Sequence, residues 1–309
     1  REGMDSWKAK KKFFAFSIIP GFIWIIAFFF LPLAFVWIMS FGEKSNIIDV
    51  VITGTFDNYT RAFDGIYFKV FAQSLLISLI TTFICLVISL PIAFLISFSS
   101  KRVKTFLLIL IILPFWTNLL IRTYSLIAIL RSEGHVNKFL EFLWVKINSI
   151  LLFLGIYDEQ ITTYEFVPLD LLYNNFSVIF GLVYIYIPFM IIPIYVVLDK
   201  FDKSYIEASL DLGAGQIKTL FKIIIPLIYP GIISGILLVL IPCLGSFVTP
   251  DLLGGSNSQM IGNVIERQFK SANDWPFGAA LSFLLIYITI GLILIHSLFN
   301  NKIVEEKIL

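Results

Sequence analysis

The stretch YIEASLDLGAGQIKTLFKIIIP runs from Tyr205 to Pro226 and separates two long apolar segments. Its GAGQIKT portion looks at first like a phosphate-binding loop. That motif needs a glycine directly before the lysine, so that backbone N–H groups can wrap the phosphates. Ile217 precedes Lys218 instead, and no buried-strand pattern leads into the segment. The stretch is therefore not predicted to bind ATP.

The same stretch predicts two short helices joined by a turn. The first begins near Ser204 and runs to about Leu212, and Gly213 supplies the permissive backbone of the turn. Pro226 is expected to end the second helix and to start the next apolar segment. Such a pair is either an ordinary amphipathic loop at a membrane surface or an exposed docking element. The second helix carries Ile217, Leu220, Phe221 and Ile224 on one face.

The composition around this stretch is that of an integral membrane protein. Of 309 residues, 58% are hydrophobic and only 14% are charged, whereas a soluble domain carries about 25% charged residues. The net charge of +2 and the lack of a basic stripe with interleaved aromatics give no indication of nucleic acid.

The residue types that carry catalysis or bind metals are scarce. Cys85 and Cys243 stand alone within apolar segments, where small core residues are expected rather than a disulfide or metal pair. His135 and His296 are the only histidines and lie far apart in sequence. We therefore expect no metal, no cofactor and no catalytic residues.

A membrane-spanning helix needs about 20 mostly apolar residues. The fold class predicted is an all-α polytopic membrane protein, with a six-helix domain over 13–299 between basic tail 1–12 and tail 300–309. Prolines 32, 91, 114, 188, 193 and 242 are expected to kink these helices. The six qualifying segments are 13–41, 71–97, 105–130, 176–198, 227–249 and 277–299.

The distribution of Lys and Arg predicts the orientation. Segments 1–12, 98–104, 199–226 and 300–309 together hold 14 basic residues in 57 positions, and the alternate connecting segments hold 8 in 101. Basic residues are enriched on the cytoplasmic side, so both termini and the loop 199–226 are expected there. A seventh apolar stretch, 139–156, is interrupted by charges. We interpret it as one or two helices lying at the outer face.

The motif EASLDLGAGQIKTLFKIIIP resembles the EAA loop of ABC importer permeases. Glu207, Ala208, Gly213, Ile223 and Pro226 match at the spacing of that family, with Ser209 in place of the second alanine and Ile225 in place of leucine. The resemblance implies the type I importer permease fold. It also implies that this loop is the coupling helix seated in a separate ATPase subunit, with Gly213 forming the turn and Glu207 making a polar contact.

Further segments are similar to the B-type subunit of the spermidine/putrescine permeases. They are LPFWTNLLIRTYSL (113–126), GLVYIYIPFMIIPIY (181–195), DLLGG (251–255), IGNVIERQF (261–269) and DWPFGAA (274–280), and the likeness lapses at 140–165. The resemblance implies a small cationic substrate. The implied partners are a second permease chain, a cytoplasmic ATPase dimer and an external polyamine-binding protein.

A polyamine needs aromatic faces and acceptors along its path that do not hold it too tightly. Trp116 and Tyr184 are the first candidates for this pathway, although each of these aromatic residues fits the core or a membrane-interface belt equally well. Acids outside the spans, Asp251, Glu266 and Asp274, could attract a cation or contact a binding protein, although for each of them a solvated loop charge is the simpler interpretation. The other pathway candidates are Tyr124, Leu126 and Tyr186.

The residues leave two other functions open. The substrate of such an importer could be another small solute, such as iron or an anion. A transporter that works without ATP would show repeated halves and intramembrane charges, and neither is evident. A membrane enzyme is disfavoured because no catalytic constellation is present.

Overall fold

The computed structural model describes residues 11–45, 50–154, 166–202 and 204–306. Five helices in this part are long and apolar enough to span a membrane, and a bent helix pair makes a sixth span if it is counted as one. This confirms the expected all-α polytopic fold. The chain divides into a terminal unit, Arg1–Phe68 with Val264–Leu309, and a central unit, Lys69–Asn263.

The terminal unit consists mainly of two apolar helical runs joined to a small hairpin. Strands β1 and β2 pair antiparallel with Gly42 opposite Ile52, and α15 packs against α3, α4 and β1. Its elements are α2 Lys11–Ile25, the π-helix η1 Ile26–Phe30, α3 Leu31–Met39, β1 Gly42–Lys44, β2 Val50–Ile52, α4 Asp57–Ala62, most of α14 Ile261–Lys270, and α15 Trp275–Glu306.

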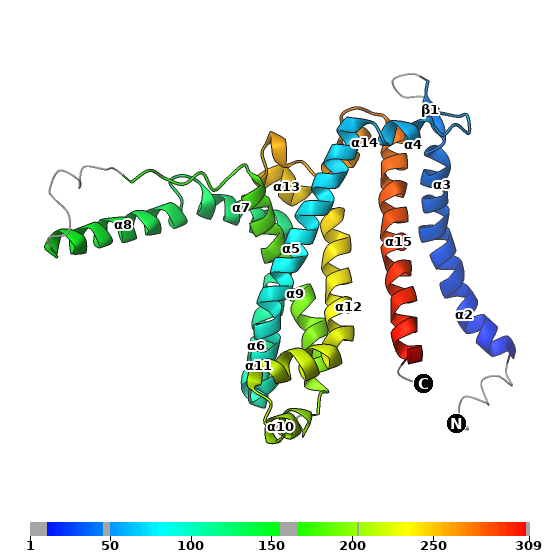
Figure 1. Cartoon of the computed structure of the whole chain (residues 1–309). Helices are drawn as coiled ribbons and strands as arrows, with labels where there is room; N and C mark the ends of the chain where they lie inside the picture. Colours follow the sequence, from blue (N-terminus) through cyan, green and yellow to red (C-terminus); the bar gives the residue numbers. More distant parts are fainter. Residues whose placement is uncertain (1–10, 46–49, 155–165, 203, 307–309) are drawn as a thin grey trace. The chain divides into compact units, whose positions relative to one another are not determined.

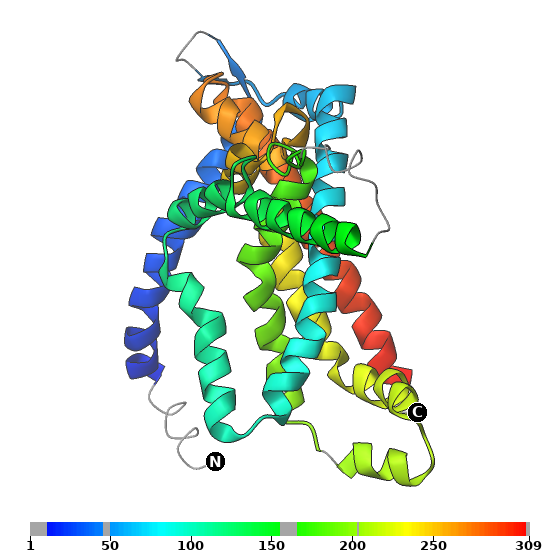
Figure 2. The same ribbon diagram turned by 90° about the vertical axis from the view of Figure 1, so that its left-hand side faces the viewer.

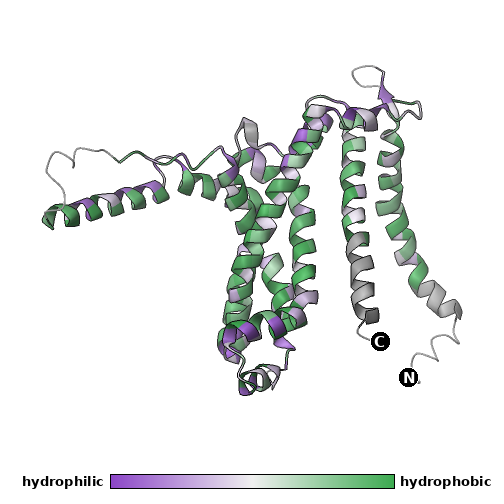
Figure 3. Cartoon of the chain, viewed as in Figure 1, coloured by the Kyte–Doolittle hydropathy of each residue, from purple (hydrophilic) through white to green (hydrophobic). Residues whose placement is uncertain are grey.

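The central unit holds the remaining helices. Their apolar residues cover most of the long helical surfaces (Figure 3). They are α5 Gly65–Phe98, α6 Lys101–Ile112, the 3-10 turn η2 Leu113–Trp116, α7 Leu119–Leu130, α8 His135–Phe153, α9 Asn175–Asp199, α10 Ser204–Asp211, α11 Gln216–Thr219, the π-helix η4 Leu220–Ile224, α12 Ile225–Leu244, α13 Val248–Leu253 and the 3-10 turn η5 Ser256–Ser258.

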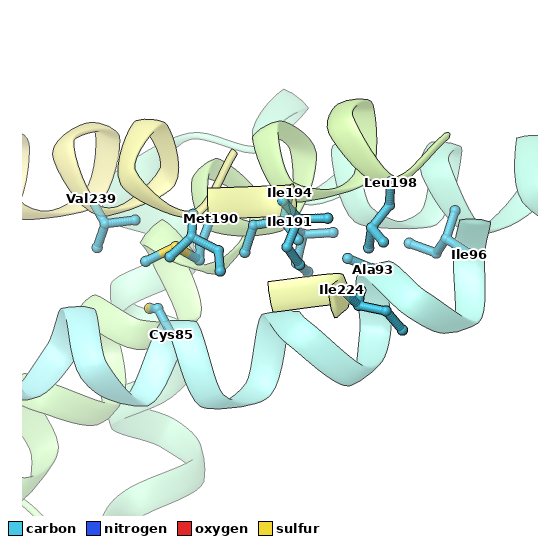
Figure 4. Close-up of a cluster of buried hydrophobic side chains, with 11 residues drawn as sticks. Cys85, Ala93, Ile96, Met190, Ile191, Ile194, Leu198, Ile224 and Val239 are labelled. Atoms are coloured by element: carbon cyan, nitrogen blue, oxygen red, sulfur yellow. The ribbon is translucent and has the colours of Figure 1, made fainter. Parts of the chain in front are cut away.

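The main core of the central unit lies between α5, α9 and α12. Met190, Ile191 and Ile194 of α9 meet Ala93 of α5 and Val239 of α12 in this cluster (Figure 4). Cys85 belongs to the same cluster, and Cys243 belongs to a second one nearby. Both thiols are free and fully buried, which confirms the expectation of small core residues.

The two ends of the central unit differ in content. The turn between α5 and α6 lies at one end together with α10 and α11, whereas α7, α8 and α13 lie at the opposite end (Figures 1 and 2). At the first end Lys104 of α6 forms an ion pair with Asp199, the last residue of α9. This end carries the loop singled out by the sequence motif.

The segment 105–130, expected to be one span, is broken. The chain extends at Thr117 and Asn118, and the helices on either side are bent by 97°. Pro114 lacks the N–H that a continuing helix needs, and the Asn118 side chain caps α7 by accepting the Leu120 N–H at 2.8 Å. These two local signals outweigh the continuity of the apolar run.

Pro226 also behaves differently from the expectation that it ends a helix. The helical run continues from Gln216 to Leu244, because a π-helical segment, η4, ends at Ile224, two residues before Pro226. The same arrangement recurs at Pro32, which follows the π-helix η1. Proline has no N–H to donate, so one carbonyl of the preceding turn loses its usual partner. A π-type turn shifts the hydrogen bonds of that carbonyl to other N–H groups, and the helix continues past the proline.

Candidate functional site

The loop between α9 and α12 folds as two short helices whose turn is set by Gly213. The Gly213 N–H donates to the Leu210 carbonyl at 2.9 Å and the Ala214 N–H to the Ser209 carbonyl at 3.1 Å. This pair of bonds is the Schellman ending of a helix, which places its glycine in a left-handed conformation. Gly213 has φ +79. Its role in the turn is therefore conformational, because the space around it is open.

A buried hydrogen bond holds the two short helices together. The Ser209 and Thr219 hydroxyls lie 2.9 Å apart, and both residues are almost completely buried. Thr219 also donates to the Gly215 carbonyl at 3.2 Å. Ser209, a departure from the family motif at the second alanine, is thus the residue that joins α10 to α11. In the sequence, the only hint of this contact is that Ser209 and Thr219, two small hydroxyl residues, lie ten positions apart on the two predicted helices.

The other motif residues lie where a partner could reach them. Glu207, Ala208 and Pro226 are exposed, and Ile223 is half-buried. Within the described residues the Glu207 carboxylate makes no hydrogen bond or ion pair. Large apolar side chains surround the turn and are open to solvent, namely Tyr205, Leu210, Leu212, Ile217 and Phe221, with Leu212 89% exposed.

Arg122 was not expected at the break between α6 and α7. It is 8% exposed, and its guanidinium donates to the Pro114 carbonyl and, at 3.2 Å, to the Thr117 carbonyl. The Pro114 carbonyl also accepts the Thr117 N–H at 3.2 Å and the Thr117 hydroxyl at 2.7 Å. Arg122 therefore adds donors at the break, where the helical ladder is interrupted. The guanidinium also lies 5.9 Å from the ring centre of Tyr184.

The five pathway candidates do not share one surface. Trp116 is 88% exposed, and Tyr124 and Tyr184 are also exposed. Leu126 is buried beside Gly181 of α9. Tyr186 turns into the core and donates its hydroxyl to the Pro242 carbonyl at 3.1 Å. The structure therefore groups Trp116 and Tyr184 around the break and separates Tyr186 from them.

Two of the three outer acids are already paired. Asp274 accepts from Arg61 at 2.8 Å and caps the start of α15, and Glu266 pairs with Lys270 one turn later at 2.7 Å. Asp251 is exposed in the first turn of α13 and has no ion pair within the described part of the chain. It is the freest of the three to meet a cation.

The family described as "Binding-protein-dependent transport system inner membrane component" matches residues 65–304, which include the whole loop. The chain belongs to this family. It is 41% identical to the spermidine/putrescine transport system permease protein PotB of Escherichia coli (strain K12), covering 92% of this chain and 96% of that protein. It is 37% identical to the protein of the same description from Haemophilus influenzae, covering 96% and 97%.

A solved transport permease has the same fold at low sequence identity. A chain of a bacterial ABC transporter involved in the import of the acidic polysaccharide alginate superposes with a TM-score of 0.65 at 16% identity, covering 96% of this chain and 99% of that one. The chain thus has the ABC importer permease fold, and its family is one of inner-membrane transport components.

Proposed function

We propose that this chain is a permease subunit of an ATP-driven polyamine importer, and that α10, α11 and the turn at Gly213 form its docking element for a cytoplasmic ATPase. The observation that carries the proposal is the combination of a rigid turn with an exposed apolar rim. Leu212, Ile217 and Phe221 are 89%, 75% and 63% exposed. Such side chains at the polar end of a membrane protein favour a protein partner over water.

The proposed coupling between the ATPase and the membrane helices depends on the rigidity of the loop. The Schellman turn and the Ser209–Thr219 bond make the two helices one body, and η4 continues this body into α12 without a break. A displacement of the docked loop is therefore passed directly to α12, which packs along α9. Closure of the ATPase would switch the helices from inward-facing to outward-facing.

The proposed assembly has four kinds of partner. A dimer of ATPase chains binds at the loop end, and a second permease, a different chain, completes the pathway. An external binding protein delivers the substrate at the end that carries α7, α8 and α13. Both termini are placed in the cytoplasm, since the segments next to them share the excess of basic residues with the loop.

The substrate proposed is spermidine or putrescine. The support is the similarity to PotB proteins together with exposed aromatic rings that suit a polyamine cation. Arg122 already occupies the surroundings of Tyr184, so Trp116 offers the freest aromatic face. Asp251 is the acid proposed to attract the cation at the outer end. A Trp116→Leu change is expected to raise the KM for uptake, and Trp116→Phe to keep it nearly unchanged.

The test is uptake of labelled spermidine by proteoliposomes that hold this chain with its co-purified partners, with and without internal ATP. Gly213→Ala and Gly215→Ala form a matched pair. Both sites have open space for a Cβ, but only Gly213 has a left-handed φ, where alanine costs about 1–2 kcal/mol. Uptake is expected to require ATP, to fall several-fold in Gly213→Ala and to persist in Gly215→Ala.

Three other results would redirect the proposal. ATP hydrolysis without spermidine uptake, combined with competition by another solute, would keep the importer and reject the polyamine. Equal effects of the two glycine variants would reject the turn as the coupling device. Uptake that does not depend on ATP would reject the importer itself.

A further inference from the structure

Helix α8 lies largely outside the packed core of the central unit. Only its first turns are held by the chain. Asn137 is 2% exposed, donates to the Leu169 carbonyl at 3.1 Å and accepts the Leu169 N–H at 2.9 Å. Beyond these turns nearly every side chain is exposed within the described residues, including Phe153 at 91%. The helix is thus anchored at one end and open along the rest.

The exposed part of α8 has two chemically different faces. At 3.6 residues per turn, an arc of about 140° contains no polar residue. Five of its large side chains are 37–60% exposed, and Leu140 and Leu151 are half-buried. The opposite face is mixed: it carries Lys138, Glu141, Asn148 and Ser149 together with Phe142, Val145 and Leu152. The apolar arc consists of Phe139, Leu140, Leu143, Trp144, Ile147, Ile150 and Leu151.

The direction of α8 excludes a membrane-spanning role. The run that contains α7 and α8 is bent by 97° from α6, and α8 projects sideways at the end of the central unit opposite α10 (Figures 1 and 2). Its charged Glu141 and Lys146 fall in the middle of the helix. A charge of this kind costs about 2.5–3.5 kcal/mol at the bilayer centre. The helix therefore runs roughly perpendicular to the spans, at one membrane boundary.

We propose that α8 lies flat in the outer leaflet, with its apolar arc in the acyl region and its polar face among the phospholipid headgroups. We assign lipid to the arc because the helix runs across the spans at their end and the residues at the borders of the arc are of the types found at membrane interfaces. An interfacial helix of this type buries its apolar face ~5–10 Å into the boundary. The assignment to the outer leaflet rests on the orientation proposed above.

Two side chains at the border of the arc fit this position. Trp144 closes the arc on one side, and tryptophan is enriched at membrane interfaces. Lys146 lies near the other border, with its Nζ 5.8 Å from the ring centre of Phe142. A lysine so placed runs its aliphatic stem along the apolar surface and carries its ammonium to the phosphate level.

The experiment is a depth measurement with spin labels on the full chain in phosphatidylcholine–phosphatidylglycerol vesicles. Single cysteines replace Leu143 and Ile147 on the apolar arc, with Glu141→Cys and Asn148→Cys as matched controls on the polar face. The native Cys85 and Cys243 are buried, and the unsubstituted chain gives their background. Accessibility to oxygen is compared with accessibility to a water-soluble nickel chelate.

The expected result is an oxygen-to-nickel ratio several-fold higher for the two arc labels than for the two controls. High nickel accessibility on both faces would place α8 in water and overturn the proposal. Arc labels that are immobilised and poorly accessible to both reagents would show a protein cover, such as a second copy of the chain, and would also overturn it. Each face carries two alternative label positions. If one cysteine variant misfolds, the other position on the same face still gives the comparison.

Discussion

At the scale of single residues, the loop and the broken helix are each held by one side chain that local pattern did not single out. Ser209 joins α10 to α11 through Thr219, and Arg122 supplies hydrogen bonds at the bend after α6. The first bond joins two helices and the second adds donors at an interrupted one. Substitutions at these positions are therefore expected to act on geometry more than on substrate contact.

The Ser209–Thr219 pair predicts an asymmetric mutational effect. Ser209→Ala removes one partner but leaves the Thr219 hydroxyl bonded to the Gly215 carbonyl, so the loss of stability is expected to be below about 1 kcal/mol. Thr219→Val leaves the buried Ser209 hydroxyl without that bond, at a cost of about 1–3 kcal/mol. Thermal unfolding of the two single variants and the double variant measures this. A larger effect for Ser209→Ala would contradict the assignment.

Arg122→Ala is expected to destabilise the bend. It removes the charge-assisted hydrogen bonds to the Pro114 and Thr117 carbonyls, and bonds of this kind contribute about 1.5–3 kcal/mol. The Pro114 carbonyl keeps its bonds from Thr117. ATP-driven uptake should fall with the stability. Arg131→Ala, at the exposed end of the same helix, is the matched control and should unfold like the unsubstituted protein. If both variants unfold alike, Arg122 does not hold the break.

At the scale of elements, the close packing of α12 on α9 depends on two glycines. A Cβ on Gly231 would stand 2.9 Å from the Pro193 carbonyl oxygen, which belongs to the backbone of α9. A Cβ on Gly235 would meet mainly the sulfur of Met190, at 2.6 Å. Small residues at such contacts let helix backbones approach within a membrane.

These contacts predict that Gly231→Ala destabilises the central unit more than Gly235→Ala. The Met190 side chain can rotate away, whereas the carbonyl of Pro193 moves only with its helix. Unfolding temperatures of the two variants, measured in detergent, give the comparison. Gly21→Ala has open space around it and serves as the neutral reference. A larger loss of stability in Gly235→Ala would contradict this prediction, and would mean that the backbone of α9 at Pro193 moves more easily than the Met190 side chain.

At the scale of the whole molecule, the proposed orientation predicts which surface cysteines react from each side of the membrane. Leu212→Cys, in the loop, should react with an impermeant maleimide only in inside-out vesicles. Asp251→Cys, at the opposite end of the central unit, should react only from outside in intact spheroplasts. The buried native cysteines should remain silent. Reversed labelling would invert the topology derived from the basic residues.

The sequence alone predicted the class of the protein and its most informative loop. The length of apolar runs, the excess of lysine and arginine, and the motif spacing from Glu207 to Pro226 are properties of neighbouring residues. These features can therefore be recognised without a structure. The family match over 65–304 agrees with that prediction, and so does the helical fold.

The tertiary structure decided what depends on distant partners. The sequence offered Asp274 as an outer acid that could attract a cation, and only the structure shows that Arg61, 213 residues away in sequence, is its ion-pair partner. Tyr186 stays a pathway candidate, and only the structure shows that its hydroxyl donates to the Pro242 carbonyl of the neighbouring helix α12. At the break within 105–130, the carbonyls of Pro114 and Thr117 accept hydrogen bonds from Arg122, and Pro114 also accepts from Thr117. A helical period shows which side of a segment is apolar, but the packing of the chain determines which residues that side meets.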